Sequence, residues 1–306
     1  MIAGPAFVGT DLPLKLFVKG KVRDTYELGD DRLLMVATDR LSAFDHVLPN
    51  GIPDRGKVLT QLSIFWFSQT DTFQPNHLVS GMVPDLPPAL KDHREELAGR
   101  FMIVRKAKRI DFECVVRGYL AGSAWSEYKQ SQTLAGEPMP PGLQQSQQLA
   151  TPIFSPATKA PSGHDENITF DTMKKSLGDD LAGKLRDASL ALYRYGAELS
   201  AKRGLILADT KFEFGLIGDD LVLIDEVLTP DSSRYWDIAT FQVGTSPDSY
   251  DKQFVRDWLS RSGWDKESEA PRLPTDVVTQ TRLRYLTAYQ RIVGKPLFPP
   301  KPRNER

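Results

Sequence analysis

The sequence predicts an α+β fold divided into two domains or lobes. Its 306 residues correspond to about two domains of ordinary size. Strand-like runs dominate the first hundred residues, whereas the C-terminal half mixes a sheet with several amphipathic helices. Hydrophobic residues make up 40% of the chain and charged residues 26%. This composition is typical of a globular protein and argues against a disordered, collagen-like or membrane-embedded chain.

Charge and cysteine content narrow the class of protein further. The 39 Lys and Arg residues balance 40 Asp and Glu residues, so the net charge is -1, and no basic excess indicates a nucleic-acid or membrane partner. One cysteine excludes an intrachain disulfide, and four scattered histidines do not suggest a zinc site. No signal peptide and no apolar span of about 20 residues is evident. We therefore expect a cytoplasmic protein.

The N-terminal third is predicted to be mostly strands. Residues 21–28 and 32–38 are β-rich and flank a Gly-Asp-Asp turn, which indicates a hairpin. Residues 57–70 place apolar side chains on one stripe and predict a helix. Further strands are expected at residues 100–105 and 113–117.

Residues 132–167 differ in character from the rest of the chain. Proline, glutamine, serine and glycine dominate, so we expect an irregular insertion. Its glutamine-rich part is typical of a surface excursion. The part at 155–167 carries more hydrogen-bonding and charged groups, and it is equally compatible with a functional loop and with a structural one.

Three helices are expected in the C-terminal half. Apolar residues between 181 and 199 follow helical spacing, and Lys202, Arg203 and Gly204 provide a basic last turn and a C-cap. Residues 248–261 and 276–293 also show helical patterns.

A hairpin at residues 205–226 contains the most informative acidic residues. If its loop has three residues, Ile217 pairs with Leu221, and Glu213 then lies opposite Asp225. Two facing carboxylates repel each other, so a shared proton, a basic side chain or a divalent cation is needed between them.

Alternation along the first strand places Asp209, Lys211 and Glu213 on the same face. Oxygen ligands of this type suit Mg²⁺, which commonly links one or two carboxylates to nucleotide phosphates. The alternative is a surface ladder of salt bridges. The argument depends on register, because a change of one residue in the loop moves Glu213 away from Asp225.

Two other stretches suggest anion binding. Arg117 ends a strand, and a glycine-containing loop leads from it to Ser123, a candidate N-cap of the next helix. Such a strand–loop–helix junction suits a phosphate monoester, and Arg234 could add a second guanidinium. The alternative is an ordinary capped turn.

Lys19, Gly20 and Lys21 open the first hairpin and could cover a polyphosphate, although such turns are also common on surfaces. Residues 51–58 approach the P-loop pattern but have valine where Ser or Thr must reach magnesium, so we reject a P-loop.

A nucleophilic hydrolase is not supported. Asp39 and Ser42 follow a strand, where they could bind a polar substrate, although Asp39 could instead pair with Arg40. No Gly-x-Ser-x-Gly elbow is present, and Ser42 has no nearby His and Asp in sequence. Cys114 lies in an apolar strand and is expected to be inert.

Together these motifs resemble the phosphoribosylaminoimidazole-succinocarboxamide synthase (SAICAR synthetase) family. The stretches that carry the resemblance are GKVRDTYEL (20–28), DRLSAFD (39–45), ECVVRGYLAGS (113–123), LADTKFEFG (207–215) and DEVLTPDSSRYWD (225–237). The segment TPIFSPATKAPSGHDENI (151–168) is similar to the family's longer, single-function form.

The resemblance implies an ATP-dependent ligase of purine biosynthesis. Its substrates would be the carboxyaminoimidazole ribonucleotide CAIR, L-aspartate and ATP, and its products SAICAR, ADP and phosphate, with an acyl phosphate as the intermediate. It also implies an N-terminal nucleotide-binding lobe, residues 1–108, similar to that of protein kinases. Residues 109–306 would form the substrate and metal lobe of a monomeric enzyme.

The resemblance also implies roles for individual residues. Lys19, Gly20 and Lys21 would lie near the ATP phosphates, and the backbone of Arg105, Lys106 and Ala107 would meet adenine. Glu213 and Asp225 would hold Mg²⁺. The ribose phosphate of CAIR would bind Arg117, Ser123 and Arg234, while Asp209 and Lys211 would contact its reacting end. For L-aspartate the candidates are Asp39, Ser42 and the loop at 164–167.

Two other functions remain open on the sequence. A small-molecule kinase would share ATP and magnesium but need no amine acceptor. A nucleotide-binding regulator would lack catalysis, although the presence of Glu213, Asp225, Lys211 and both arginines argues against it.

Overall fold

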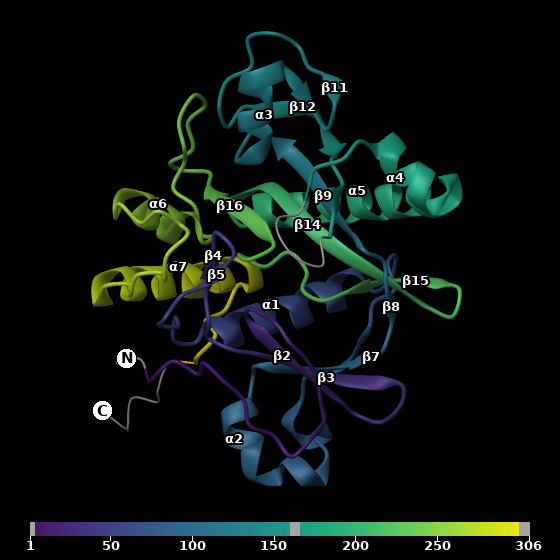
Figure 1. Ribbon diagram of the computed structural model, residues 1–306, viewed down its shortest axis with the longest axis vertical. Helices are drawn as coiled ribbons and strands as arrows, with labels where there is room; N and C mark the ends of the chain where they lie inside the picture. The colour runs from purple at the N-terminus through teal and green to yellow at the C-terminus, as the bar shows by residue number, and fades with distance from the viewer. Residues whose placement is uncertain (1–3, 160–165, 300–306) are drawn as a thin grey trace.

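The computed structural model describes residues 4–159 and 166–299, and within these ranges its two larger sheets lie one above the other (Figure 1). The N-terminal sheet has the strand order β1-β2-β3-β7-β6. Its strands are β1 (Leu16–Lys19), β2 (Arg23–Glu27), β3 (Arg32–Ala37), β6 (Leu78–Ser80) and β7 (Phe101–Arg105). All neighbouring pairs in this sheet are antiparallel.

The second sheet is centred on one long strand, β14 (Leu205–Ile217), which contains most of the predicted polar face. β14 pairs with β9, β15, β16 and β8, and β9 also pairs with β12 and β13. The bounds are β8 (Lys108–Arg109), β9 (Phe112–Tyr119), β12 (Gln148–Phe154), β13 (Ala157–Thr158), β15 (Asp220–Ile224) and β16 (Ser233–Asp237). Two short hairpins are formed by β4 (Ser42–Ala43) with β5 (His46–Val47), and by β10 (Thr133–Leu134) with β11 (Glu137–Pro138).

Helices fill the space between and beside the sheets. They are α1 (Arg55–Thr70), α2 (Arg94–Leu97), α3 (Ser123–Ser131), α4 (Phe170–Leu177), α5 (Asp179–Lys202), α6 (Gln253–Arg261) and α7 (Thr275–Val293), with 3₁₀ turns at Val83–Asp85 and Pro88–His93. This mixture confirms the predicted α+β class. No helix in the described part of the chain is both long and apolar enough to span a membrane.

The largest core joins the two halves of the chain. Helix α1 lies between the sheets in Figure 1, and its Leu62 and Trp66 are fully buried. They belong to the same apolar cluster as Phe212 and Phe214 of β14 and Leu192 of α5. This helix is covered on several sides, and its buried residues are accordingly not confined to one stripe of the helix surface. The core therefore fixes the N-terminal sheet relative to β14.

Most of the predicted elements are present. The β2–β3 hairpin is confirmed, and α1, α5 and α7 cover the expected residues. Helix α6 begins at Gln253 rather than at residue 248: Lys252 is its N-cap, and the Asp251 carboxylate before it accepts a hydrogen bond from the Gln253 amide at 2.7 Å. Strand β1 was not predicted.

The expectation that residues 132–167 are irregular is wrong for part of the segment. β12 pairs with β9, placing Gln148 opposite Tyr119 and Ile153 opposite Arg117, and β13 adds to the same strand. Proline content was misleading because Pro152 lies in an edge strand, where a missing amide donor is tolerated. Residues 160–165 lie outside the described ranges.

The two sheets meet between Arg105, the last residue of β7, and Lys108, the first of β8. We therefore propose that the two lobes divide near residue 108 and that α1 packs against both of them.

His77 provides a prediction about acid stability. Burial lowers the pKa of its imidazole from 6.5 to about 3, and Nε2 has no hydrogen-bond partner in the described structure. The folded protein therefore holds His77 neutral, whereas the unfolded chain takes up a proton below pH 6.5. Stability should fall by about 1.4 kcal/mol per pH unit as pH decreases from 6.5 towards 3.

Urea unfolding at pH 6.5 and pH 5.0 measures this effect. We expect His77 to account for roughly 2 kcal/mol of the loss over this interval in the wild-type protein. His77→Gln should reduce the pH dependence by that amount, with the other histidines as an internal background. Equal slopes in the two proteins would contradict the assignment.

Candidate functional site

The polar face predicted on β14 exists. Asp209, Lys211 and Glu213 are partly exposed, whereas Thr210 and Phe212 between them are buried on the opposite face. The alternation follows directly from the strand's period of two. The three charged side chains therefore share one face of the central strand of the second sheet.

The predicted register of the β14–β15 hairpin is wrong by one residue. Ile217 pairs with Asp220, so the loop contains only Gly218 and Asp219, and Glu213 lies opposite Ile224 rather than Asp225. Gly218 has a φ of 61°, which allows this tight two-residue connection. The sequence Gly218-Asp219-Asp220 does not by itself show that Asp220 belongs to the strand and not to the loop.

Asp225 nevertheless lies close enough to Glu213 to interact with it. It follows the end of β15 in a left-handed conformation, with φ of 64°, so the chain leaves the strand at this residue. Burial raises the pKa of the Asp225 carboxyl; Arg23 opposes the rise and the charge of Glu213 adds to it. Glu213 and Asp225 therefore form an acidic pair as predicted, although they are not opposite each other in the strand pairing.

Basic side chains balance this acidic pair. Arg23 of β2 lies 3.0 Å from an Asp225 carboxylate oxygen and 3.2 Å from Glu226, whose side chain is only 10% exposed. Lys159 forms an ion pair with Glu213. Sequence analysis missed Arg23, Glu226 and Lys159, since their contacts join distant parts of the chain.

Lys211 has an acidic partner of its own. Its Nζ lies 2.6 Å from Oε1 of Glu113 on the neighbouring strand β9. Burial opposes the charged form of Lys211, but Glu113 outweighs it and raises the lysine pKa. Lys211 is therefore a fixed positive charge beside Glu213. Glu113 was also missed by sequence analysis, although it stands in the quoted ECVVRGY motif.

Two predicted arginines converge on Asp209. β14 pairs with β9 on one side and β16 on the other, placing Asp209 opposite both Arg117 and Arg234. Its Oδ2 atom is 3.3 Å from Arg234 and 3.9 Å from Arg117. Arg117 is buried, its Nε atom has no partner in the described structure, and desolvation lowers its pKa. Spare guanidinium donors of this kind suit a phosphate or carboxylate ligand.

Ser123 lies at this site but is not an N-cap. Gly122 occupies the cap position, and Ser123 is the first residue of α3. The Ser123 hydroxyl accepts a hydrogen bond from Arg117 at 3.1 Å. A Cβ on Gly122 would lie 2.8 Å from the Arg234 guanidinium, so only glycine lets the loop approach this arginine.

The Lys19–Lys21 turn lies between β1 and β2, two residues before Arg23. Its Gly20 amide already donates to the Arg23 carbonyl at 2.7 Å, so this amide is not available to cover a phosphate. Arg40 donates to the carbonyls of Gly20 and Lys21 and fixes the turn from behind. The Lys19 and Lys21 side chains are exposed, and Lys21 contacts Asp45.

The predicted adenine-contacting stretch links the two sheets. The amide of Arg105 donates to His77 and that of Lys106 donates to Asp31, so neither of these donors is free for a base. Ala107 packs against Gly215, where an added Cβ would lie 2.9 Å from the Ala107 methyl. Of the backbone groups of Arg105 and Lys106, the carbonyls therefore remain as candidates for contacts with adenine.

Asp39 is structural, contrary to its expected role in substrate binding. It is 1% exposed, its Oδ1 accepts from Gly56 at 2.9 Å and from Arg100 at 3.1 Å, and its Oδ2 accepts from Phe7 at 2.8 Å. A carboxylate occupied in this way cannot also bind a ligand. Ser42 lies in β4, paired with Val47. Of the loop at 164–167, positions 164 and 165 lie outside the described residues.

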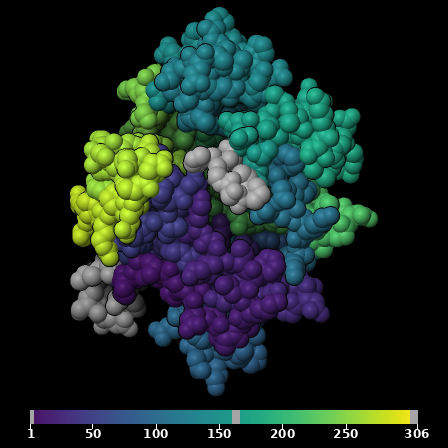
Figure 2. Space-filling model, viewed as in Figure 1, coloured from purple at the N-terminus to yellow at the C-terminus, as the bar shows by residue number. Residues whose placement is uncertain are grey.

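Arg117, Ser123, Asp209 and Arg234 line one cleft of about 1210 Å³, which also contains Lys21. Its other walls come from the β4–β5 hairpin, the loop before α3, α6 and the segment that follows α6: Phe44, Asp45, His46, Gly122, Gln253, Arg256, Ser260, Asp265, Lys266 and Glu267. Figure 2 shows the surface hollowed between the teal upper part and the yellow-green C-terminal part. Charged side chains from both sheets therefore share one space.

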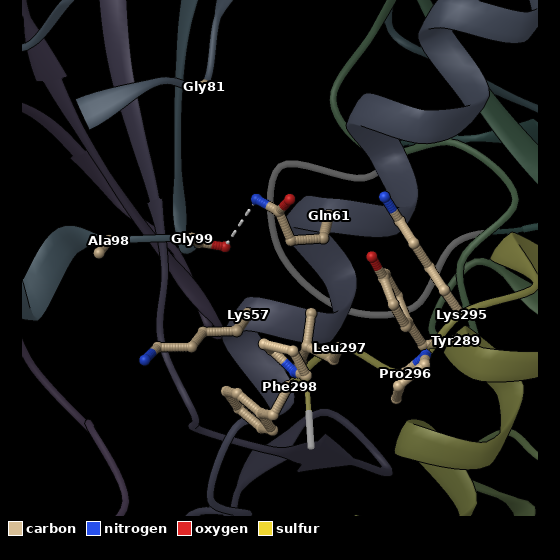
Figure 3. A pocket seen from close by; sticks show the side chains of 11 residues that line it. Lys57, Gln61, Gly81, Ala98, Gly99, Tyr289, Lys295, Pro296, Leu297 and Phe298 are labelled. Carbon is tan, nitrogen blue, oxygen red and sulfur yellow. Dashed lines mark hydrogen bonds between the residues drawn. The ribbon is translucent and has the colours of Figure 1, made fainter. Parts of the chain in front are cut away.

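A smaller cavity of about 600 Å³ lies elsewhere, between α1 and the chain after α7 (Figure 3). Gln61 of α1 donates to the Gly99 carbonyl at 3.2 Å on one side, and Tyr289 and Lys295 form the other. None of the residues predicted for catalysis or binding lines it. The larger cleft thus holds the residues predicted to bind the CAIR phosphate, whereas Lys211 and Glu213 lie further along the same face of β14.

The acidic pair can hold Mg²⁺ only together with ligands that the protein does not supply. Among the described residues, no three His, Cys, Asp or Glu side chains converge so as to hold a metal ion by themselves. Glu213 and Asp225 supply two carboxylates, which is the usual protein contribution when nucleotide phosphates and water complete the coordination. The residues present therefore suit a magnesium ion that arrives with ATP.

These features define a class of enzyme that acts on anionic, phosphorylated substrates: basic groups in a polar cleft beside β14, and a carboxylate pair formed by Glu213 of β14 and Asp225 after β15. The SAICAR synthetase family model matches residues 16–271. Phosphoribosylaminoimidazole-succinocarboxamide synthase of Syntrophobacter fumaroxidans is 51% identical over 287 residues, which cover 93% of this chain and 95% of that protein. The chain belongs to the SAICAR synthetase family.

Solved structures agree with this assignment. SAICAR synthase of Saccharomyces cerevisiae, solved with SAICAR, superimposes with a TM-score of 0.87 at 41% identity, covering 95% of this chain and 99% of that one. A SAICAR synthetase solved with ADP gives a TM-score of 0.69 at 25% identity, covering 91% and 98%. The fold and family that the motifs implied are confirmed.

Proposed function

We propose that this chain is an ATP-dependent ligase that joins CAIR to L-aspartate and releases SAICAR, ADP and phosphate, in purine biosynthesis. The observation that carries the proposal is the polar face of β14. Within five residues, this one strand places Asp209 between Arg117 and Arg234, and Glu213 beside Asp225. Family membership and the relatives solved with SAICAR and with ADP support it.

The phosphate of CAIR is assigned to the basic end of the cleft. Arg117 and Arg234 carry charge next to Ser123, and the rigid fork of each guanidinium can bind phosphate oxygens in pairs. Asp209 holds both arginines in place and, with Lys211, faces the reacting end of the substrate. Anchoring the phosphate there positions the CAIR carboxylate near Glu213 and Asp225.

The reaction needs activation of a carboxylate, whose leaving group would otherwise be oxide. Transfer of the γ-phosphoryl group of ATP to a CAIR carboxylate oxygen gives an acyl phosphate and ADP. The amine of aspartate then attacks the carbonyl carbon, phosphate leaves and the amine loses a proton. No enzyme nucleophile is required, which is consistent with an inert, fully buried Cys114.

Nucleotide binding is assigned to the edge of the N-terminal sheet. Arg23 connects the turn of Lys19 and Lys21 to Asp225, so phosphates lying below that turn would reach the acidic pair. Glu213 and Asp225 would hold Mg²⁺, whose chemistry here is neutralisation of the phosphate charge during transfer. Carbonyl groups between Arg105 and Ala107 would meet adenine.

L-Aspartate is assigned to the part of the cleft opposite the CAIR phosphate. Asp39 cannot serve there because its oxygens are used internally. Arg256 and Lys266 line that part, and the Arg256 Nε is buried without a partner in the described structure. Two cations match the two carboxylates of aspartate.

Release of ADP in the presence of CAIR, with and without L-aspartate, tests the function. Strict dependence on aspartate, with amide formation, is expected for the ligase. A stable phosphorylated product without aspartate would indicate a kinase instead, and nucleotide binding without turnover would indicate a regulator.

Arg117→Ala and Arg234→Ala should weaken CAIR binding more than ATP binding. Each removes a charge-assisted contact to phosphate, so we expect the KM for CAIR to rise by at least about 10-fold, while the KM for ATP changes little. Steady-state kinetics with each substrate varied in turn measure both values. Arg272→Ala, at an exposed position, is the matched control, and an unchanged KM for CAIR in both variants would refute the phosphate assignment.

We also propose a cytoplasmic monomer. The residues that line the cleft come from one chain, which supports this proposal. Sedimentation equilibrium should give a mass near 34.3 kDa; a dimer mass at assay concentrations would contradict this.

A further inference from the structure

The side chain of Lys159 is largely enclosed and lies against the predicted metal ligand Glu213. Its ammonium contacts Oε1 of Glu213, and the exposed fractions of the two side chains are only 23% and 15%. Lys159 directly follows β13, far in sequence from β14. The contact therefore depends on how β13 is anchored.

The backbone around Lys159 is well anchored. Ala157 and Thr158 pair with Glu113 and Phe112 of β9, and the Lys159 amide donates to the Asp111 carbonyl at 3.3 Å. The Thr158 amide also donates to the Glu166 carbonyl at 2.9 Å. The strand that carries Glu113 thus also places the Lys159 ammonium beside Glu213.

The other cations near the acidic pair are already engaged. Arg23 contacts Asp225 and Glu226, and Lys211 contacts Glu113. In the described structure, Glu213 has its ion pair with Lys159 alone. Without this ammonium, Glu213 would lose its direct ion pair in the described structure and would face the negative charge of Asp225, while the nearby Lys211 and Arg23 stay engaged by other carboxylates.

We propose that Lys159 is a tethered cation that takes the place of the divalent ion on Glu213 and leaves this carboxylate when metal and nucleotide bind. The proposal rests on the metal site assigned above. The ammonium contacts the Glu213 carboxylate that would hold the ion, so the two would compete for it. Lys159 then finds a new anionic partner in the phosphates that enter with the metal.

This competition has a functional consequence. Lys159 holds Glu213 in its binding orientation while metal is absent, and it weakens the binding of metal alone. When nucleotide is present, the phosphates offer the ammonium a partner and the cost of displacing it falls. Metal and nucleotide therefore bind cooperatively, and Lys159 is the positioning residue through which they are coupled.

Binding of Mn²⁺ in the absence of nucleotide tests this directly. Free Mn²⁺ is quantified by electron paramagnetic resonance for the wild-type chain and for Lys159→Met. We expect Lys159→Met to bind Mn²⁺ about 5-fold more tightly, equivalent to roughly 1 kcal/mol, because the competing ammonium is gone. With a non-hydrolysable ATP analogue present, the advantage should shrink or reverse.

Lys108→Met is the matched control. Lys108 is exposed and lies opposite Leu216 on the same β14 strand, and no ion pair or hydrogen bond of its side chain is seen in the described structure. The substitution removes the same charge from the same sheet without removing the proposed competitor. Its Mn²⁺ affinity should equal that of the wild type; an equal gain in both variants would reduce the effect to long-range charge and overturn the proposal.

A second measurement uses the wild-type protein, so it does not depend on a variant. Acetylation of Lys159 by an amine-reactive reagent, quantified by mass spectrometry, should increase when Mg²⁺ alone is added, while labelling of Lys108 stays constant. Unchanged Lys159 labelling at saturating Mg²⁺ would overturn the proposal.

The outcomes separate this inference from the function on which it rests. Equal Mn²⁺ affinity in the wild type and in Lys159→Met would overturn the role of Lys159 and leave the metal site intact. No Mn²⁺ binding with or without nucleotide, in an enzyme that still turns over, would overturn both. Tighter binding in Lys159→Met alone, together with increased labelling, supports the competition.

Discussion

Glu213→Gln and Asp225→Asn are each expected to reduce kcat by about 100-fold or more while the protein remains folded. Both substitutions keep the shape of the side chain and remove one negative charge from the pair. That pair would hold the Mg²⁺ ion that neutralises the transferring phosphate. Loss of a comparable electrostatic group in other enzymes costs roughly 3 kcal/mol of transition-state stabilisation. The measurement is ADP release at saturating CAIR, aspartate, ATP and Mg²⁺, with circular dichroism as the check on folding.

Asp219→Asn provides the matched control for these two variants. Asp219 is exposed in the two-residue loop of the same hairpin, so the substitution removes a carboxylate from the same element without touching the cleft. Its kcat should equal that of the wild type. Near-normal rates in both Glu213→Gln and Asp225→Asn at saturating Mg²⁺ would remove the metal-site assignment.

Asp231→Asn should destabilise the folded protein strongly. Asp231 accepts a 2.7 Å hydrogen bond from Tyr285 and forms ion pairs with Arg55, which is fully buried, and with Lys252 at 3.3 Å. Burial opposes its charged form, but Arg55 and Lys252 outweigh this and lower the Asp231 pKa. The network joins the start of α1 to α7 and to the turn before β16.

Neutralising Asp231 leaves the buried Arg55 and the partly buried Lys252 without their counter-charge. Breaking one partner of a buried ion pair typically costs about 3–5 kcal/mol, so we expect the melting temperature to fall by roughly 10 °C. Calorimetry measures this fall. Asp180→Asn, which removes an exposed partner of Lys184 on α5, should leave the melting temperature nearly unchanged. A similarly small effect at Asp231 would show that the buried network contributes little.

Local pattern was sufficient for much of the site. The alternation of Asp209, Lys211 and Glu213 on one strand follows from the β period alone, and their shared face was predicted without knowledge of their neighbours. Helices α5 and α7 were predicted equally well, because an apolar stripe and a glycine after the last turn are local signals.

Register and partnership were not predictable in this way. One residue of uncertainty in the hairpin loop was enough to misplace Asp225, which leaves β15 in a left-handed conformation and still interacts with Glu213. Asp39 and Asp209 are both carboxylates in quoted motifs, yet Asp39 is enclosed by backbone amides and Arg100, whereas Asp209 faces a cleft. Burial decides between these roles, and it depends on residues distant in sequence.

The amino-acid sequence by itself determined which side chains could perform the chemistry, because periodicity and motif are properties of neighbouring residues. The tertiary structure alone decided which charges meet. Arg23 reaches Asp225 across about two hundred residues, and β13 positions Lys159 on Glu213. Such contacts depend on the packing of two sheets around α1, and the energy that holds opposite charges together depends on distance and burial, which no local pattern encodes.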